Sequence, residues 1–167
     1  MANTARFSET HGIVGLTVPL ADNYNAGMTM DSINMAKYNH CTIVLIGSDS
    51  CAGAGVLTIY GGATDGATTA AITFTYRISA ADVGAASGDV FGTPATSAAL
   101  TLVEASIKSG MYVIEIDAED LNISGTQYQF ITPVLSAAGT AGIVSAVALL
   151  SEARDEKAVM PTAIPTS

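Results

Sequence analysis

The feature that most constrains the fold is an alternation of apolar and polar residues with a period of two. It is clearest over Ile72–Ile78, where four large apolar side chains are separated by Thr73, Thr75 and Arg77. Successive side chains of a strand point to opposite faces, so this pattern predicts a strand with one buried face.

Similar short segments recur along the chain between turn signals, and eight or nine strands are expected in all. They are Val14–Leu20, Ser32–Ala36, Cys41–Gly47, Val56–Tyr60, Leu100–Val103, Met111–Asp117, Gln127–Thr132 and Ala141–Leu150. Many short strands predict an all-β antiparallel sandwich or barrel, and eight favour a jelly-roll-like sandwich.

Three of these segments carry further expectations. The run Cys41–Gly47 is apolar apart from Thr42, which predicts a central strand covered on both faces. Ala141–Leu150 contains residues at helical spacing, but its β-branched residues favour a strand. Gly61, Gly62 and the Asp65–Gly66 pair predict a hairpin connection after Tyr60.

The chain has 167 residues, which suits one domain. We expect the sandwich to span residues 13–151, with an extended N-terminal arm over 1–12 and an extended C-terminal tail over 152–167. Asp22–Gly27 is a turn cluster. Residues 79–98 form either a long projecting loop or a segment with a short helix around Ala80–Ala86.

Composition excludes one class of partner and favours another. Six basic residues face fifteen acidic ones, for a net charge of −9, and Arg77 is the only base between Lys37 and Lys108. Nucleic-acid binding needs clustered Lys and Arg, so we expect no nucleic-acid partner. Charged residues make up only 13% of the chain, a surface composition that suits contact with other proteins.

Targeting signals are not apparent in the sequence. The polar N-terminus has no apolar signal region, and the longest apolar run, Ala141–Leu150, is about half the length that a bilayer requires. We therefore expect no membrane partner and synthesis in a cytoplasm. Cys41 and Cys51 are too few for a disulfide scaffold and are expected to be free thiols.

The residues that catalysis or metal binding would need do not fall into a recognised pattern. His40 and Cys41 are neighbours in a predicted strand and should point to opposite faces, which argues against a nucleophile pair. A zinc site would require Cys41, Cys51, His11 and His40 together, at spacings that match no usual arrangement.

Other candidate motifs are equally incomplete. Ser48–Cys51 lacks the surroundings of a nucleophile elbow, and Gly53–Gly55 lacks the rest of a dinucleotide fingerprint. A loop carboxylate group could bind calcium, although no calcium-loop pattern surrounds it; its members are Asp117, Glu119, Asp120 and Asn122. We therefore predict a protein without enzymatic activity, catalytic residues, metal ligands or cofactors.

Five segments together resemble small structural proteins from the head modules of tailed bacteriophages. They are Val18–Gly27, Lys37–Val44, Phe74–Arg77, Tyr112–Glu119 and Leu149–Arg154. The resemblance spans most of the chain, from about Ile13 to Ile164. It implies a capsid decoration (cement) protein that binds the outside of the virion shell, bridges major capsid subunits and acts as a dimer or trimer. It carries over no functional residue.

Two alternatives remain open. The first is a tail, neck or fibre component of the same virion. The second is a carbohydrate-binding jelly-roll module, in which Tyr24, Tyr38 and Tyr60 would supply stacking platforms. Core or interface packing is the simpler role for these tyrosines.

Overall fold

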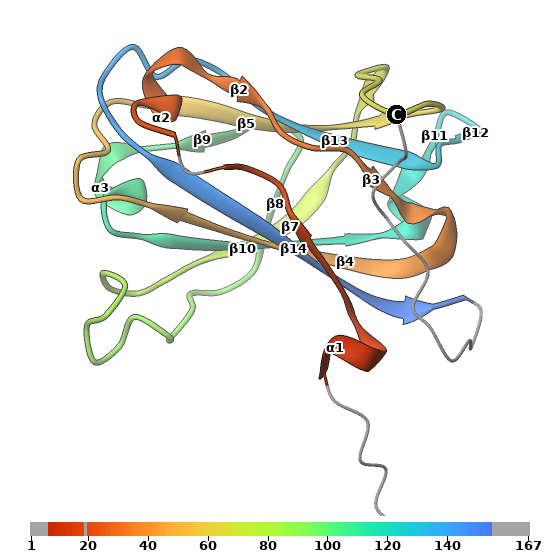
Figure 1. The fold of residues 1–167 in the computed structure, drawn as a ribbon, viewed down its shortest axis with the longest axis horizontal. Coiled ribbons are helices and arrows are strands. Elements are labelled where there is room, and N and C mark those ends of the chain that lie inside the picture. Colours follow the sequence, from red (N-terminus) through yellow and green to blue (C-terminus); the bar gives the residue numbers. More distant parts are fainter. Residues whose placement is uncertain (1–6, 19, 155–167) are drawn as a thin grey trace, which may run out of the picture.

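Two antiparallel β-sheets packed face to face form the molecule (Figure 1). The computed structural model describes residues 7–18 and 20–154. Sheet A contains, in spatial order, β1 (Gly12–Gly15), β14 (Val144–Ala153), β4 (Tyr38–Gly47), β10 (Met111–Asp117), β7 (Phe74–Ile78) and β8 (Ala95–Ser97). Sheet B contains β2 (Met28–Thr29), β3 (Ile33–Asn34), β13 (Phe130–Leu135), β5 (Gly55–Gly62), β6 (Ala70–Ala71) and β9 (Leu100–Leu102). The predicted all-β sandwich is therefore confirmed.

Strand pairing is nested from the ends of the chain inward. Strand β1 pairs with β14, β2 and β3 pair with β13, β4 pairs with β10, and β5 pairs with β6 and β9. This order is that of a jelly roll, in which a folded ribbon of paired strands wraps into two sheets. Strands β7 and β8 extend sheet A beyond β10.

Short helices and one small hairpin complete the described structure. The helical segments are α1 (Phe7–Thr10), α2 (Asn23–Ala26), α3 (Glu104–Ile107) and the 3-10 turns η1 (Met35–Lys37) and η2 (Ala118–Leu121). The hairpin pairs β11 (Asn122–Ile123) with β12 (Thr126–Gln127).

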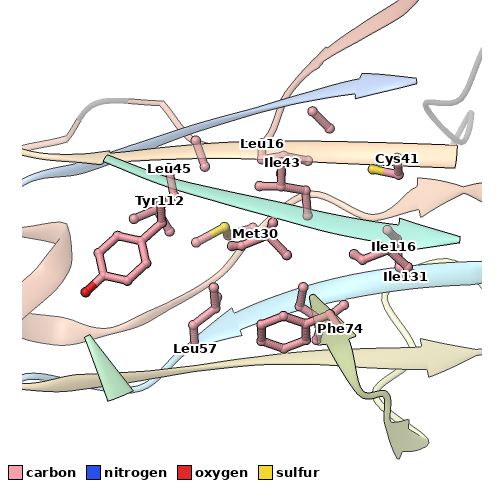
Figure 2. Close-up of a cluster of buried hydrophobic side chains, with 14 of the residues drawn as sticks. Leu16, Met30, Cys41, Ile43, Leu45, Leu57, Phe74, Tyr112, Ile116 and Ile131 are labelled. Atoms are coloured by element: carbon pink, nitrogen blue, oxygen red, sulfur yellow. The ribbon is translucent and has the colours of Figure 1, made fainter. Parts of the chain in front are cut away.

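The core lies between the two sheets. In β10, Tyr112, Ile114 and Ile116 are fully buried, and the residues between them face outward, as the alternation predicts. Figure 2 shows side chains from both layers meeting there, among them Leu45 of β4 and Leu57 of β5. Burying such a side chain contributes roughly 1.5–3 kcal/mol.

Two buried polar side chains tie the connections to the sheets. Asn23 bonds both backbone groups of Val144, donating through Nδ2 and accepting at Oδ1, each at 2.7 Å. The hydroxyl of Tyr24 donates to the Leu102 carbonyl at 2.8 Å and accepts from the Gly55 amide at 2.9 Å. The predicted turn Asp22–Gly27 is thus a helical turn that locks β14 of sheet A to β5 and β9 of sheet B.

Strand β4 differs from its prediction in one respect. It is central in sheet A, but only one of its faces is covered. Cys41, Ile43 and Leu45 are buried, whereas Val44 is half-buried and Ile46 is 37% exposed. The apolar run of β4 therefore does not mean that both faces are covered: both faces of the strand carry apolar side chains, but solvent reaches one of them.

The ends of the chain also differ from expectation within the described residues. Phe7–Thr10 of the predicted extended arm form helix α1, and Gly12 already belongs to β1. At the other end, β14 continues to Ala153, so Glu152 and Ala153 belong to the sheet and not to an extended tail. Residues 1–6 and 155–167 of the expected arm and tail lie outside the described residues.

The remaining strand predictions hold in part. Gln127–Thr132 is not one strand, because Gln127 ends β12 and Phe130 begins β13. Ala141–Leu150 forms a strand, which begins at Val144, and a hairpin follows Gly62 and returns as β6. The predicted strand Val14–Leu20 ends early, since β1 stops at Gly15. Ser32–Ala36 contains the two-residue β3 and then turns into η1, where the Asn34 side chain accepts from the Ala36 amide.

Residues 79–98 form a projecting loop without the alternative helix at Ala80–Ala86. Backbone hydrogen bonds hold the loop, including Ala80 N to Val90 O at 2.7 Å and Val83 N to Ser109 O at 2.6 Å. It ends in β8, which pairs with β7. Figure 1 shows the loop extending from sheet A on the side away from sheet B.

Candidate functional site

The outward side of sheet A is the most distinctive surface of the described chain, and we call it the sheet A face. Strand register arranges its side chains in four rows across the sheet. The first row contains Ser151, His40 and Asp117. The second row contains Ile13, Leu149, Thr42, Glu115 and Thr75. The third row contains Gly15, Val147, Val44, Val113 and Arg77, and the fourth contains Ser145, Ile46 and Met111.

Most of the large side chains in the second to fourth rows are apolar and reachable by solvent. Ile13 is 53% exposed, Ile46 is 37% exposed, and the valines beside them are half-buried. The solvated face of an antiparallel sheet is normally polar. A contiguous apolar face of this kind marks a contact surface for another protein.

Two projections border the sheet A face. In Figure 1, helix α1 and the loop over residues 79–98 both extend from sheet A away from sheet B. Both carry exposed apolar side chains: Phe7 is 52% exposed, and Val83 and Val90 are 45% and 52% exposed. The Phe7 ring stacks on His11 with centroids 4.1 Å apart. The apolar character of the face therefore extends onto its rim.

Charges on the face are few and balanced. Arg77 of β7 and Glu115 of β10 are diagonal neighbours, since Val113 pairs with Arg77 and Glu115 pairs with Thr75. At one end of the face, His40 Nδ1 and Asp117 Oδ1 are 2.7 Å apart, a hydrogen-bonded contact that is an ion pair when the imidazole is protonated, and no other ion pair joins described residues. Arg77 and Glu115 are thus both free of ion pairs within the described residues.

His40 and Cys41 point to opposite faces, as the sequence predicts. His40 lies at the end of the sheet A face, where Nε2 also contacts Thr42 Oγ1 at 3.2 Å. Cys41 is fully buried, and burial raises the pKa of its thiol to about 12. A neutral thiol separated from the imidazole by the sheet cannot act as its nucleophilic partner.

The two candidate metal sites do not form among the described residues. No group of three or more His, Cys, Asp or Glu side chains there could hold a metal ion. Cys51 is buried and donates to the Ile143 carbonyl at 3.3 Å. The carboxylate of Asp120 accepts from the Asp117 amide at 2.9 Å, closing a cap on η2. These carboxylates stabilise a turn.

Ser48–Cys51 forms the connection between β4 and β5. The hydroxyl of Ser48 accepts from the Ile143 amide at 3.2 Å and lies 2.8 Å from the Ser50 hydroxyl. Neither histidine bonds to these hydroxyls in the described chain. The segment is therefore a loop bonded to the start of β14, as expected.

Burial excludes two of the three tyrosines considered for sugar stacking. Tyr24 and Tyr38 are fully buried in the core, and only Tyr60 of β5 is partly exposed, on the outer side of sheet B. A stacking platform needs an exposed ring face, so the expected group of three platforms does not exist.

Several open clefts lie at the margins of the sandwich, among them two that adjoin strands of sheet A. One, of about 650 Å³, lies between the ends of β4, β10 and β14 and is polar; its lining includes Asn39, Asp117, Glu119, Glu152 and Arg154. Arg154 there donates to Asn39 at 2.9 Å. The other, of about 520 Å³, runs between residues 15–18 and 29–31. We call it the edge groove; Val18, which lines it, is 71% exposed.

Comparison with known proteins identifies no relative. No family model, no curated protein and no solved structure matches this chain. Among the helices of the described residues, none combines the length and apolar character needed to cross a membrane. The class that the fold and surface define is a jelly-roll β-sandwich with an apolar outer sheet face.

Sequence reasoning did not identify the sheet A face. Its residues come from five strands far apart in the chain, from Ile13 to Ser151. One signal was present: the apolar residues between the buried positions of β4, Val44 and Ile46, were interpreted as core. Together with the apolar outer positions of β10 and β14, Val44 and Ile46 indicate an apolar outer face of sheet A.

Proposed function

We propose that this protein is a structural subunit of a tailed-phage virion that binds the outer surface of the capsid and stabilises contacts between major capsid subunits. The observation that supports the proposal best is that the described surface offers two places for contact with other chains: the apolar, nearly uncharged sheet A face and the edge groove. A protein whose role is contact needs such surfaces and needs no reactive centre.

A second surface allows more than one contact at a time. The edge groove lies where the chain leaves β1, and Val18 in its lining is exposed. A cement protein must touch at least two neighbours, and repeated modest contacts over a lattice give tight retention. We assign the edge groove to the capsid, since an apolar side chain of a capsid subunit would bury Val18 there.

The phage assignment is drawn from the five sequence segments that resemble head-module proteins. Virions purified from the source phage should therefore contain this protein in a simple ratio to the major capsid protein, as measured by quantitative mass spectrometry. A few copies per particle would instead support the tail, neck or fibre role. Absence from particles would contradict a virion role altogether.

Attachment can be tested with purified protein and capsids that lack it. We expect the protein to cosediment with such capsids, and Val18→Glu to reduce the bound fraction because it places a charge in an apolar contact. Thr101→Glu, at an exposed position of β9 on sheet B, is the matched control. Equal loss with both variants, or no loss with Val18→Glu, would remove the edge groove from the proposal.

A further inference from the structure

The sheet A face exposes apolar side chains to solvent and carries few charges. We propose that a second copy of this chain covers it, forming a two-fold symmetric, face-to-face dimer. This inference does not rest on the capsid role, since it concerns purified protein alone.

Charge restricts where two copies can meet. Each chain carries a formal net charge of −9, so two copies repel one another over most of their surfaces. On the sheet A face, the second to fourth rows contain one base and one acid, Arg77 and Glu115, and no other charged residue. This face is therefore a place where close approach of a second copy carries little repulsion.

The rows themselves are self-complementary about one axis. Consider a two-fold axis that lies between the copies, crosses the strands, and passes midway between the second and third rows. It places the second row of each copy over the third row of the other, so that contacts occur in reciprocal pairs. Thr42 then meets Val44, and Leu149 meets Val147 of the second copy.

Shape agrees with this axis at the β1 edge. Ile13, in the second row, is 53% exposed, and it opposes Gly15 in the third row of the second copy. A Cβ atom built on Gly15 would meet nothing within 4 Å, so the glycine leaves open space on the face. The projecting isoleucine of each copy fits the space above the glycine of the other.

Charge agrees with the same axis at the β7 edge. Glu115 in the second row comes to lie over Val113 of the second copy, one strand from that copy's Arg77. Two reciprocal Glu115–Arg77 pairs result. Packed sheets cross at an angle of about −30°, so the corners of the two sheet A faces lie farther apart than their centres. His40 and Asp117 then lie at the rim of the contact, where polar groups are usual.

The area of the face approaches that of a specific contact. Five strands, each occupying about 4.8 Å of the sheet, cover about 24 Å, and four outward positions along β4 span about 20 Å, for a planar area of about 500 Å². Corrugation and the apolar rim increase this towards the roughly 800 Å² per partner of a standard specific interface. Homodimer interfaces are also more apolar than other protein surfaces.

The test is sedimentation velocity of the full chain at several concentrations. We expect a dimer, and we expect Gly15→Glu to raise the dimer Kd at least about tenfold, because it fills the space opposite Ile13 with a charge. Thr58→Glu is the control: it places the same charge in the middle of a strand on the outer side of sheet B and should leave the dimer intact.

A charge exchange tests the arrangement itself. Arg77→Glu gives a face with two acids and Glu115→Arg a face with two bases, so each variant alone should lose the dimer. Mixed in equal amounts they should form a heterodimer, because each acid then faces a base. A monomer at all concentrations, a dimer unaffected by Gly15→Glu, or a mixture that stays monomeric would overturn the proposal.

Discussion

At the scale of the residue, two fully buried tyrosines, Tyr24 and Tyr112, differ in the hydrogen bonding of their hydroxyl groups. The Tyr24 hydroxyl bonds the backbone of both Leu102 and Gly55. The Tyr112 hydroxyl is buried without a partner in hydrogen-bonding geometry among the described residues. Burial raises the pKa of both phenols, so both hydroxyls are protonated near neutrality.

We therefore expect the same substitution to have different effects at the two positions. Tyr24→Phe leaves the buried Gly55 amide unpaired and should lower the free energy of unfolding by about 1–3 kcal/mol. Tyr112→Phe removes an unpaired hydroxyl and should be neutral or slightly stabilising. Denaturant unfolding of both variants measures this, and a larger loss with Tyr112→Phe would contradict the hydrogen bonding described.

At the scale of the element, two glycines that end strands of sheet A, Gly47 and Gly15, differ in how closely other atoms pack against them. Gly47 ends β4 beneath α3, where a Cβ atom would overlap the carbonyl oxygen and side chain of Ile107. Gly15 ends β1 at the sheet edge, where the same atom would meet open space. The strand pattern of the sequence does not distinguish them, because the difference lies in what packs against each strand.

The two glycines provide a matched test of this packing. Gly47→Ala should cost about 1–3 kcal/mol, since α3 and β4 must move apart. In the monomer, measured at protein concentrations below the dimer Kd, Gly15→Ala should leave stability unchanged or raise it by up to about 1 kcal/mol, since it restricts the unfolded chain. Thermal and denaturant unfolding give both values, and equal losses would argue against the close contact of Gly47 with Ile107.

At the scale of the whole molecule, the ionisable groups buried in the core make the free energy of unfolding depend on pH in the alkaline range. Burial raises the pKa of Cys41 from its ordinary value of 9.0 to about 12 and also raises the pKa of Tyr24, Tyr38 and Tyr112 above 10.0. In the unfolded chain these groups ionise at their ordinary values. The unfolded state therefore binds fewer protons than the folded state above about pH 9, and stability falls as pH rises.

We expect the guanidinium midpoint, measured under reducing conditions, to be constant from pH 7 to 8 and to fall progressively from pH 9 towards 12. Cys41→Val, which keeps an apolar side chain of similar size, should fall less steeply between pH 9 and 10, before the tyrosines contribute. A midpoint that rises with pH, or identical slopes for the two proteins near pH 9, would show that the thiol is not shielded as described.

By itself, the sequence determined the class of fold, because the period-two alternation of segments such as Ile72–Ile78 is a local property of strand geometry. It also determined the opposite orientation of His40 and Cys41 and the turn at Ser48–Cys51. Tertiary structure alone decided which apolar residues are core. Val44 and Ile46 have the same chemistry as Ile43 and Leu45, and only the position of sheet B, which covers one side of β4, distinguishes them. The sheet A face depends in addition on strand register between segments more than 100 residues apart, such as Ile13 and Leu149, which no local pattern encodes.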